Sequence, residues 1–157
     1  MRGTAIRKLA VVAVLAGLLG GLVTTSASAG TYGGKYRDRG QLLKATNASR
    51  EYRHLRRLDL QAELSRLARK HSKRMAEAGV LFHTKNPSSY YLRGRRWSSW
   101  GENVGFTSGN ARDVHKEFMH SPTHRSNILR STFRRVAIGT FRDDDGLLYV
   151  TVFFYSP

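Results

Sequence analysis

The sequence predicts an α+β fold in which helices cover both faces of a small sheet. Two amphipathic segments lie in the first half of the chain, and two β-rich segments joined by an Asp-Gly turn lie at its end. The second β-rich segment, residues 147–155, is apolar at odd and even positions alike. Because successive side chains of a strand point to opposite faces, this strand is expected between two layers. The chain therefore favours helices on both sides of the sheet.

The N-terminal segment has the pattern of a secretory signal. Basic residues at positions 2, 7 and 8 precede an apolar run over residues 9–23 and a small-x-small site at residues 27–29. A run of about fifteen residues is short for a bilayer span of roughly twenty. We therefore expect a signal peptide over residues 1–29, cleavage near Ala29, and an extracellular mature protein without a transmembrane segment. Residues 30–40 hold four glycines and predict a flexible lead-in to one domain over residues 41–157.

The mature chain is basic and contains no cysteine. The full chain has 27 basic and 11 acidic residues, and loss of the three basic residues of the signal leaves a formal charge of +13. Such a charge attracts anionic envelope polymers or lipids, although an arginine-rich surface can also serve solubility alone. A specific nucleic-acid partner is not expected, and the sequence does not predict an oligomeric state. Without disulfides, stability depends on packing, which favours a bacterial setting.

The first predicted helix begins at Gln41. Its apolar stripe comprises Leu42, Ala45, Ala48, Tyr52 and Leu55, and its opposite face carries Lys44, Arg50, Arg53 and Arg56. Asn47 lies within this helix, where an amide without partners is costly. We therefore expect Asn47 to bind a neighbouring loop.

The second predicted helix runs from Leu60 to Ala78, with Gly79 as its C-cap. His71 lies on the apolar stripe of this helix. A lone imidazole in such a place is more often a hydrogen-bonded core residue than a ligand. His71 is therefore not expected in the functional site.

A long connection rich in aromatic residues and arginine follows a predicted turn at residues 86–89. It contains Tyr90, Tyr91, Trp97 and Trp100 interleaved with Arg93, Arg95 and Arg96. Aromatic faces beside arginines can stack on bases or sugars. Aromatics in a connection also commonly fill the core beneath it, and this second interpretation is favoured.

The last elements are a third helix and a hairpin. Asn110 is the predicted cap of a helix that buries Ala111, Val114 and Phe118, and Pro122 stops it. Residues 135–141 and 147–155 are predicted strands, joined by a turn at residues 143–146.

Several catalytic patterns are excluded by residue type and spacing. No cysteine is present, and Ser108 lies one position too late in Gly105-Phe106-Thr107-Ser108-Gly109 for a nucleophile elbow. His115 and His120 are five residues apart, whereas the zincin pattern has its histidines four apart. The aspartates at 143–145 lack the alternating oxygens and final glutamate of a calcium loop.

His83, Glu102 and His124 remain as the candidate cleft. Two imidazoles and a carboxylate suffice as the protein ligands of zinc if they converge. They could also serve as general base and acid around a bound water. A purely structural role, with Glu102 and Asn103 bonded to backbone groups and the histidines bonded to them, is equally open.

Five segments in series resemble a bacterial CAP (SCP-like) domain, from the superfamily of cysteine-rich secretory proteins, insect venom antigens and plant pathogenesis-related proteins. They are Leu42-Leu43 with Thr46-Asn47, Met75-Ala76-Glu77-Ala78-Gly79 with Phe82-His83, Gly101-Glu102-Asn103-Val104-Gly105, Ser121-Pro122-Thr123-His124-Arg125-Ser126-Asn127-Ile128-Leu129, and Ala137-Ile138-Gly139. The resemblance runs from about Gln41 to Phe154. It implies a three-layer α-β-α sandwich of CAP type with a central, mainly antiparallel sheet.

The resemblance also implies a cleft with His83, His124 and Glu102, the last in a Gly-Glu-Asn turn. His83 and His124 are the implied ligands of a divalent metal, zinc or calcium. The candidates for ligand contacts beside them are Trp100, Asn103, Arg125 and Asn127. A second family glutamate corresponds to Ser121, and Thr123 stands where the bacterial pattern has glycine, so the family's tetrad is reduced.

Two functions follow as hypotheses. The first is a secreted binding module that holds an envelope, lipid or other anionic ligand in the cleft. The second is a divalent-metal-dependent hydrolase in which His83 and His124 hold the ion and Glu102 is the base for a water. The resemblance does not decide between them, because a fold does not fix a function.

Overall fold

The computed structural model describes residues 29–157. The predicted signal, apart from Ala29, lies outside these residues, so it stays a prediction. The described elements follow the order α1, β1, α2, α3, β2, α4, α5, β3, β4. Within residues 29–157, none of the helices combines the length and apolar character required to cross a membrane.

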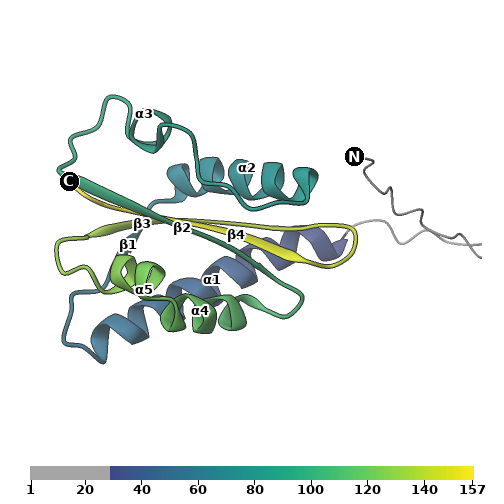
Figure 1. The fold of residues 1–157 in the computed structure, drawn as a ribbon, viewed down its shortest axis with the longest axis horizontal. Coiled ribbons are helices and arrows are strands. Elements are labelled where there is room, and N and C mark those ends of the chain that lie inside the picture. Colours follow the sequence, from purple (N-terminus) through teal and green to yellow (C-terminus); the bar gives the residue numbers. More distant parts are fainter. Residues whose placement is uncertain (1–28) are drawn as a thin grey trace, which may run out of the picture.

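Four strands form one mixed sheet in the order β1-β3-β4-β2 (Figure 1). β3 (Arg135–Arg142) and β4 (Leu148–Ser156) form the predicted antiparallel hairpin, and β2 (Ser99–Thr107) pairs with the other side of β4. The short β1 (Asp59–Leu60) pairs parallel with the start of β3. β2 is therefore an edge strand.

Helices cover both faces of the sheet, which confirms the predicted fold class. α2 (Ala62–Ala78) and the short α3 (Pro87–Tyr91) lie on one face, and α1 (Ala29–Glu51), α4 (Ala111–His120) and α5 (Pro122–Leu129) lie on the other (Figure 1). All nine residues of β4 are buried. This burial follows from the helical layer on each side of the strand.

α2 packs directly against β3. A Cβ atom added to Gly139 of β3 would lie 2.1 Å from the carbonyl carbon of Ala68 in α2, so only glycine allows this approach. α2 ends at Gly79 with a left-handed φ of 63°, as the predicted C-cap requires. Leu60, predicted as the first residue of this helix, belongs instead to β1.

Residues 30–40, for which the sequence predicts a flexible lead-in, belong to α1. Asp38 explains part of the difference. It is buried, and its Oδ2 lies 3.6 Å from the guanidinium of Arg142 at the end of β3. A residue more than one hundred positions away thus holds this half of the helix in place, and local composition gave no sign of it.

The buried face of α1 also differs from the predicted stripe. The helix ends at Glu51, and Tyr52 just beyond it is 82% exposed. The residues that α1 buries include Asp38, Leu42, Thr46, Asn47 and Arg50. Asn47 binds Leu58 in both directions, donating to its carbonyl and accepting from its N–H, as the predicted loop contact requires.

Arg50 was expected on the exposed face, but it is fully buried. Its guanidinium donates to the backbone carbonyls of Arg56, Ile128, Arg130 and Phe133. Burial, followed by the charge of Arg134, lowers the pKa of Arg50. Two of the four carbonyls lie at the C-terminal end of α5, where the helix dipole favours a cation. Arg50 therefore fixes α5 against α1.

Glu102 lies on strand β2 and not in the predicted glycine-flanked turn. The flanking glycines serve close packing instead. A Cβ atom at Gly101 would lie 2.6 Å from Asn127 Oδ1, and one at Gly105 would lie 2.9 Å from Phe118 Cε1. Together they let α4 and α5 approach the edge strand.

The third predicted helix is confirmed as α4. The side chain of Asn110 accepts from the N–H of Arg112, and the Asp113 carboxylate accepts from the N–H of Asn110, which forms a capping box. Pro122 lies beyond the end of α4 and at the first turn of α5. The stretch that carries His124 and Asn127 is therefore helical.

Candidate functional site

A cleft of about 360 Å³ opens at the β2 edge of the sheet. Its walls come from both helical layers: the loop after α2, the start of α3, β2 and α5. The lining residues are His83, Thr84, Pro87, Trp100, Gly101, Glu102 and Asn127. The cleft therefore lies where the two helical layers meet beside an edge strand.

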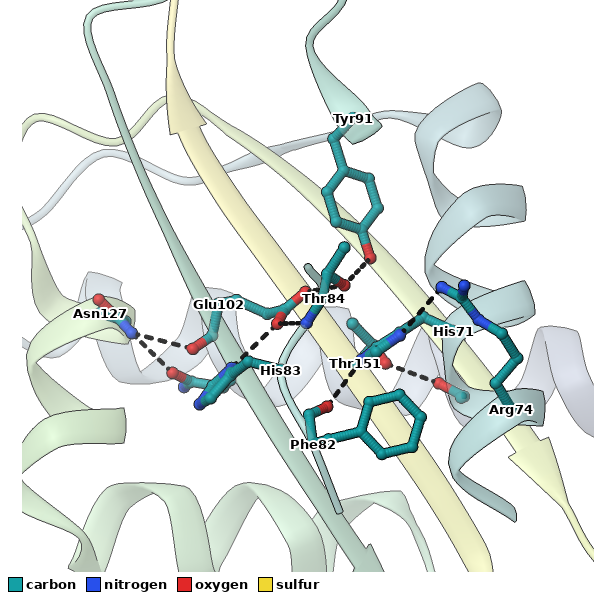
Figure 2. A network of polar contacts seen from close by, with 11 residues as sticks. His71, Arg74, Phe82, His83, Thr84, Tyr91, Glu102, Asn127 and Thr151 are labelled. Carbon is teal, nitrogen blue, oxygen red and sulfur yellow. Dashed lines mark hydrogen bonds and ion pairs between the residues drawn. The ribbon is translucent and has the colours of Figure 1, made fainter. Parts of the chain in front are cut away.

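Glu102 lines this cleft and lies within a network of hydrogen bonds (Figure 2). Its side chain is only 1% exposed. Oε1 accepts from the N–H of Thr84 at 2.8 Å and from Nδ1 of His83 at 2.9 Å, and Oε2 accepts from the Thr84 hydroxyl at 2.6 Å. Three donors thus take the place of water around the buried carboxylate.

Tyr91 extends this hydrogen-bond chain. Because the Thr84 hydroxyl donates its proton to Glu102, the Tyr91 hydroxyl donates to Thr84 Oγ1, at 3.3 Å. The ring of Tyr91 stacks on Phe153 of β4 with 4.1 Å between centroids. Burial raises the pKa of Tyr91, so its hydroxyl stays protonated at neutral pH. The connection from His83 to Tyr91 is thus tied to the sheet.

His83 combines a fixed ring with an exposed position, since 62% of its side chain is accessible. An ionised carboxylate can only accept hydrogen bonds, so the proton of the His83–Glu102 bond belongs to Nδ1. When the ring is neutral, Nε2 keeps its lone pair, and it has no hydrogen-bond partner among residues 29–157. Glu102 therefore presents one free ring nitrogen at the cleft.

His71 holds the same loop from the α2 side, and it lies outside the cleft as predicted (Figure 2). It is fully buried, with Nε2 2.8 Å from the carbonyl oxygen of Phe82 and Nδ1 3.2 Å from the guanidinium of Arg74. Burial is the largest cause of its lowered pKa. A neutral His71 that donates to Phe82 and accepts from Arg74 satisfies all of these contacts.

Asn127 forms the α5 wall of the cleft. Its Nδ2 donates to Asn103 Oδ1 at 2.8 Å and to the Glu102 carbonyl at 3.3 Å (Figure 2). Asn103 is fully buried and donates in turn to the His124 carbonyl at 2.9 Å. Asn103 thus joins β2 to α5, and Asn127 Oδ1 is left without a partner in the described chain.

The structure brings four of the predicted site residues to the cleft, namely His83, Trp100, Glu102 and Asn127. Asn103 lies buried behind it, and Arg125 is exposed on α5 without lining it. His124 packs against Phe118 with 4.9 Å between ring centroids and does not line the cleft either. Burial, and then the charge of His83, lowers the pKa of His124.

Sequence reasoning missed Thr84, which supplies two of the three donors to Glu102. A threonine in a loop carries little signal of its own. For Tyr91 the sequence favours core filling over stacking on a ligand, but a buried tyrosine also requires a partner for its hydroxyl. The need of this hydroxyl for a hydrogen-bond partner is the one signal in the sequence that indicates a polar network beside Tyr91.

A metal centre of His83, Glu102 and His124 is not formed. Within residues 29–157, no group of three or more His, Cys, Asp or Glu side chains is placed to hold a metal ion. Both oxygens of Glu102 are bonded to Thr84, and one of them also to His83. The described residues do not fit a three-ligand centre, so no chemical step is derived through a metal.

The family model of the cysteine-rich secretory protein (CAP) family matches residues 43–155. This match covers most of the chain, and the protein belongs to the CAP family. Among curated proteins, no sequence matches the chain.

Solved structures show the same fold. An extracellular protein with an SCP domain from Bacillus anthracis has a TM-score of 0.69 and 20% identity, over 78% of this chain and 41% of that one. An outer surface protein from Borrelia burgdorferi has a TM-score of 0.69 and 15% identity, over 76% and 92%. NaASP2, solved with Zn²⁺, has a TM-score of 0.60 and 12% identity, over 77% and 80%. The chain spans about two fifths of the Bacillus protein and most of the other two.

Proposed function

We propose that the protein is a secreted binding module that holds an amphipathic envelope ligand, such as an anionic lipid, in the cleft at the β2 edge. One observation carries the proposal: the indole of Trp100 and the oriented His83–Glu102 pair line the same cleft. Ligand sites commonly combine apolar surface with a few placed polar groups. This cleft has that composition.

The polar side of the cleft offers acceptors. Glu102 and Thr84 are bonded to each other, which leaves His83 Nε2 and Asn127 Oδ1 as acceptors without partners in residues 29–157. A hydroxyl or ammonium group of a ligand can donate to them. A ligand that lacks such a donor would leave these acceptors unpaired.

The apolar side is formed by Trp100 with Pro87 and Gly101. The Trp100 ring stacks on Phe153 with 6.2 Å between centroids, so the core supports it from behind. The residue nevertheless remains 37% exposed. A hydrocarbon segment of the ligand can cover this exposed surface.

The segment around the cleft is basic. Between Glu77 and Glu102 the sequence has no acidic residue, and Lys85, Arg93, Arg95 and Arg96 are all exposed. Arg95 pairs with Glu63 of α2, so the other three provide the free positive charge. Basic residues beside exposed aromatics favour attraction to an anionic envelope surface.

The hydrogen bonds of Glu102 support binding over hydrolysis. A base that activates water must accept a proton from that water, whereas both oxygens of Glu102 already accept from Thr84 and His83. The alternative function, a metal-dependent hydrolase, needs His83 and His124 to hold a divalent ion together, and His124 does not line this cleft.

Calorimetric titration with lysophosphatidylglycerol, below its micelle concentration and in 150 mM salt, tests the proposal. Trp100→Ala and His83→Ala should each weaken binding at least about tenfold, which corresponds to about 1.4 kcal/mol. Trp97→Ala is the matched control, because Trp97 is 43% exposed but does not line the cleft. His120→Ala is the matched control for the histidine.

The two controls should bind as the wild type does. Equal losses in Trp97→Ala and Trp100→Ala would mean that exposed aromatics bind the probe without the cleft. Unchanged affinity in Trp100→Ala would contradict the proposal directly.

A further inference from the structure

A second cavity of about 350 Å³ lies away from the cleft, beside the β3–β4 hairpin. Its walls are the first half of α1, the start of α4 and the end of β3, and its lining residues are Arg37, Asp38, Gln41, Asn110, Arg112 and Arg142. β2 begins beside the cleft, at the end of the sheet near the C-terminus, and runs toward this hairpin (Figure 1). The two cavities share no residue. This second one is named the arginine cavity.

Three guanidinium groups and one carboxylate line the arginine cavity. Arg142 is held by the protein, since it pairs with Asp38 and donates to the carbonyls of Gly109 and Gly146. Arg37 and Arg112 are exposed, and their side chains have no hydrogen-bond or ion-pair partner among residues 29–157. The cavity therefore carries two uncompensated positive charges.

The nearby carboxylates do not neutralise these charges from within the cavity. Asp113 accepts from the N–H of Asn110, and Asp143 accepts from the N–H of Leu147. Neither Asp113 nor Asp143 lines the cavity. Asp38 is the carboxylate that does, and its partner is Arg142.

Gln41 provides a second, independent observation. Its Oε1 is enclosed and has no hydrogen-bond partner in the described chain. Buried polar atoms in proteins are nearly always paired, so an orphan acceptor beside a cavity points to a missing donor. The terminal amide torsion of glutamine is broad, so a small rotation can direct this oxygen toward a donor in the cavity.

We propose that the arginine cavity binds a phosphate ester that carries a free hydroxyl group, of the glycerol phosphate type. Arg37 and Arg112 donate to the phosphate oxygens, and Gln41 accepts from the hydroxyl. The guanidinium fork matches the geometry of phosphate oxygens, and the volume lies in the range of small-ligand sites. The proposal goes beyond the function of the cleft and does not depend on it.

Calorimetric titration of the purified protein with glycerol 3-phosphate and with inorganic phosphate, at constant ionic strength, tests this site. The double variant Arg37→Gln/Arg112→Gln should weaken the binding of both probes at least tenfold. Arg53→Gln/Arg56→Gln is the matched control, because it removes the same charge from two exposed arginines outside both cavities. This control should bind as the wild type does.

Gln41→Leu tests the hydroxyl contact separately. It should weaken the binding of glycerol 3-phosphate at least threefold and leave the binding of inorganic phosphate unchanged. Equal effects on the two probes, or no effect on either, would overturn the role of Gln41.

Vesicles containing phosphatidylglycerol form a second arm that distinguishes a lipid headgroup from a free phosphate ester. The site is supported if the double variant Arg37→Gln/Arg112→Gln loses binding in one of the two arms and the control keeps it. The arm in which this happens shows whether the ligand is a lipid headgroup or a free phosphate ester. Equal loss in the control, full binding in the cavity variant, or no binding in either arm would overturn the proposal.

Discussion

Glu102 shapes the cleft through the hydrogen bonds that it accepts. Its carboxylate receives three donors, two from Thr84 and one from His83, while its side chain is almost inaccessible. The same bonds fix the tautomer and the direction of His83. One buried side chain thus determines which nitrogen of an exposed imidazole is available to a ligand.

Glu102→Gln should destabilise the protein by about 2 kcal/mol. The amide replaces one carboxylate oxygen by an NH₂ group, so the Thr84 hydroxyl can no longer donate to that position, and the remaining hydrogen bonds lose the charge of the acceptor. Urea denaturation at pH 7 measures this loss. Glu63→Gln removes a carboxylate from an exposed ion pair with Arg95 and should change stability by less than about 0.5 kcal/mol. Equal effects of the two substitutions would contradict the account of Glu102.

His115 gives the protein an acid-sensitive contact between α1 and α4. Its Nε2 lies 2.8 Å from Ser49 Oγ, and burial lowers the pKa of His115 from 6.5 to about 4. Between these pH values the unfolded chain binds the proton and the folded chain does not. The stabilising contribution is therefore fully present above about pH 6.5 and is lost as the pH falls toward 4.

The contribution of His115 is on the order of 2–3 kcal/mol. Urea denaturation at pH 7 and pH 4 should show a smaller acid loss in His115→Gln than in the wild type. Some loss should remain, because burial also lowers the pKa of His71 and His124. His120→Gln, at an exposed position, should keep the full acid loss. An unaltered acid loss in His115→Gln would contradict this assignment.

At the scale of elements, the site depends on how closely helices approach the sheet. Gly101 and Gly105 of β2 leave room for Asn127 of α5 and Phe118 of α4. The guanidinium of Arg50 in α1 donates to backbone carbonyl oxygens at the C-terminal end of α5. The α5 wall of the cleft is therefore positioned by contacts that do not themselves touch the cleft.

Among these close approaches of a helix to the sheet at a glycine, the contact of α2 with β3 is the tightest. Gly139→Ala would place its Cβ 2.1 Å from the backbone of Ala68. We expect a loss of about 3 kcal/mol or more, measured by thermal or urea unfolding, because neither backbone can move without disturbing its layer.

Gly40→Ala is the control for this prediction. Gly40 lies within α1, and an added Cβ would meet nothing within 4 Å. Alanine should raise stability there by roughly 0.5–1 kcal/mol, because it favours the helix. A mild effect of Gly139→Ala, similar in size to that of Gly40→Ala, would show that the layers are less closely packed than the structure indicates.

At the scale of the whole molecule, the sequence predicted what local chemistry determines. Gly79 marks the end of α2, Asn110 marks the start of α4, and the Asp-Gly turn marks the hairpin, because each acts on its own few residues. The apolar pattern of β4 predicted the layer order for a similar reason. The two-sided burial of a strand is visible in one stretch of sequence.

Contacts between distant segments were not predictable in this way. Arg50 was assigned to solvent because its carbonyl partners lie up to 83 positions away. Gly101 and Gly105 were assigned to a turn because the helices that require them are not visible in the strand itself. His83, Glu102, Trp100 and Asn127 were placed in one site, whereas Thr84 was missed because only the folded chain brings it to Glu102.

The protonation of the His83 ring shows whether Glu102 orients the imidazole at the cleft. Long-range ¹H–¹⁵N correlation spectra at pH 8 distinguish a protonated Nδ1 from a protonated Nε2. We expect His83 to carry its proton on Nδ1, with Nε2 free, because a Glu102 carboxylate can only accept. A neutral His83 with its proton on Nε2 would show that Glu102 does not orient the ring, and it would contradict the cleft described above.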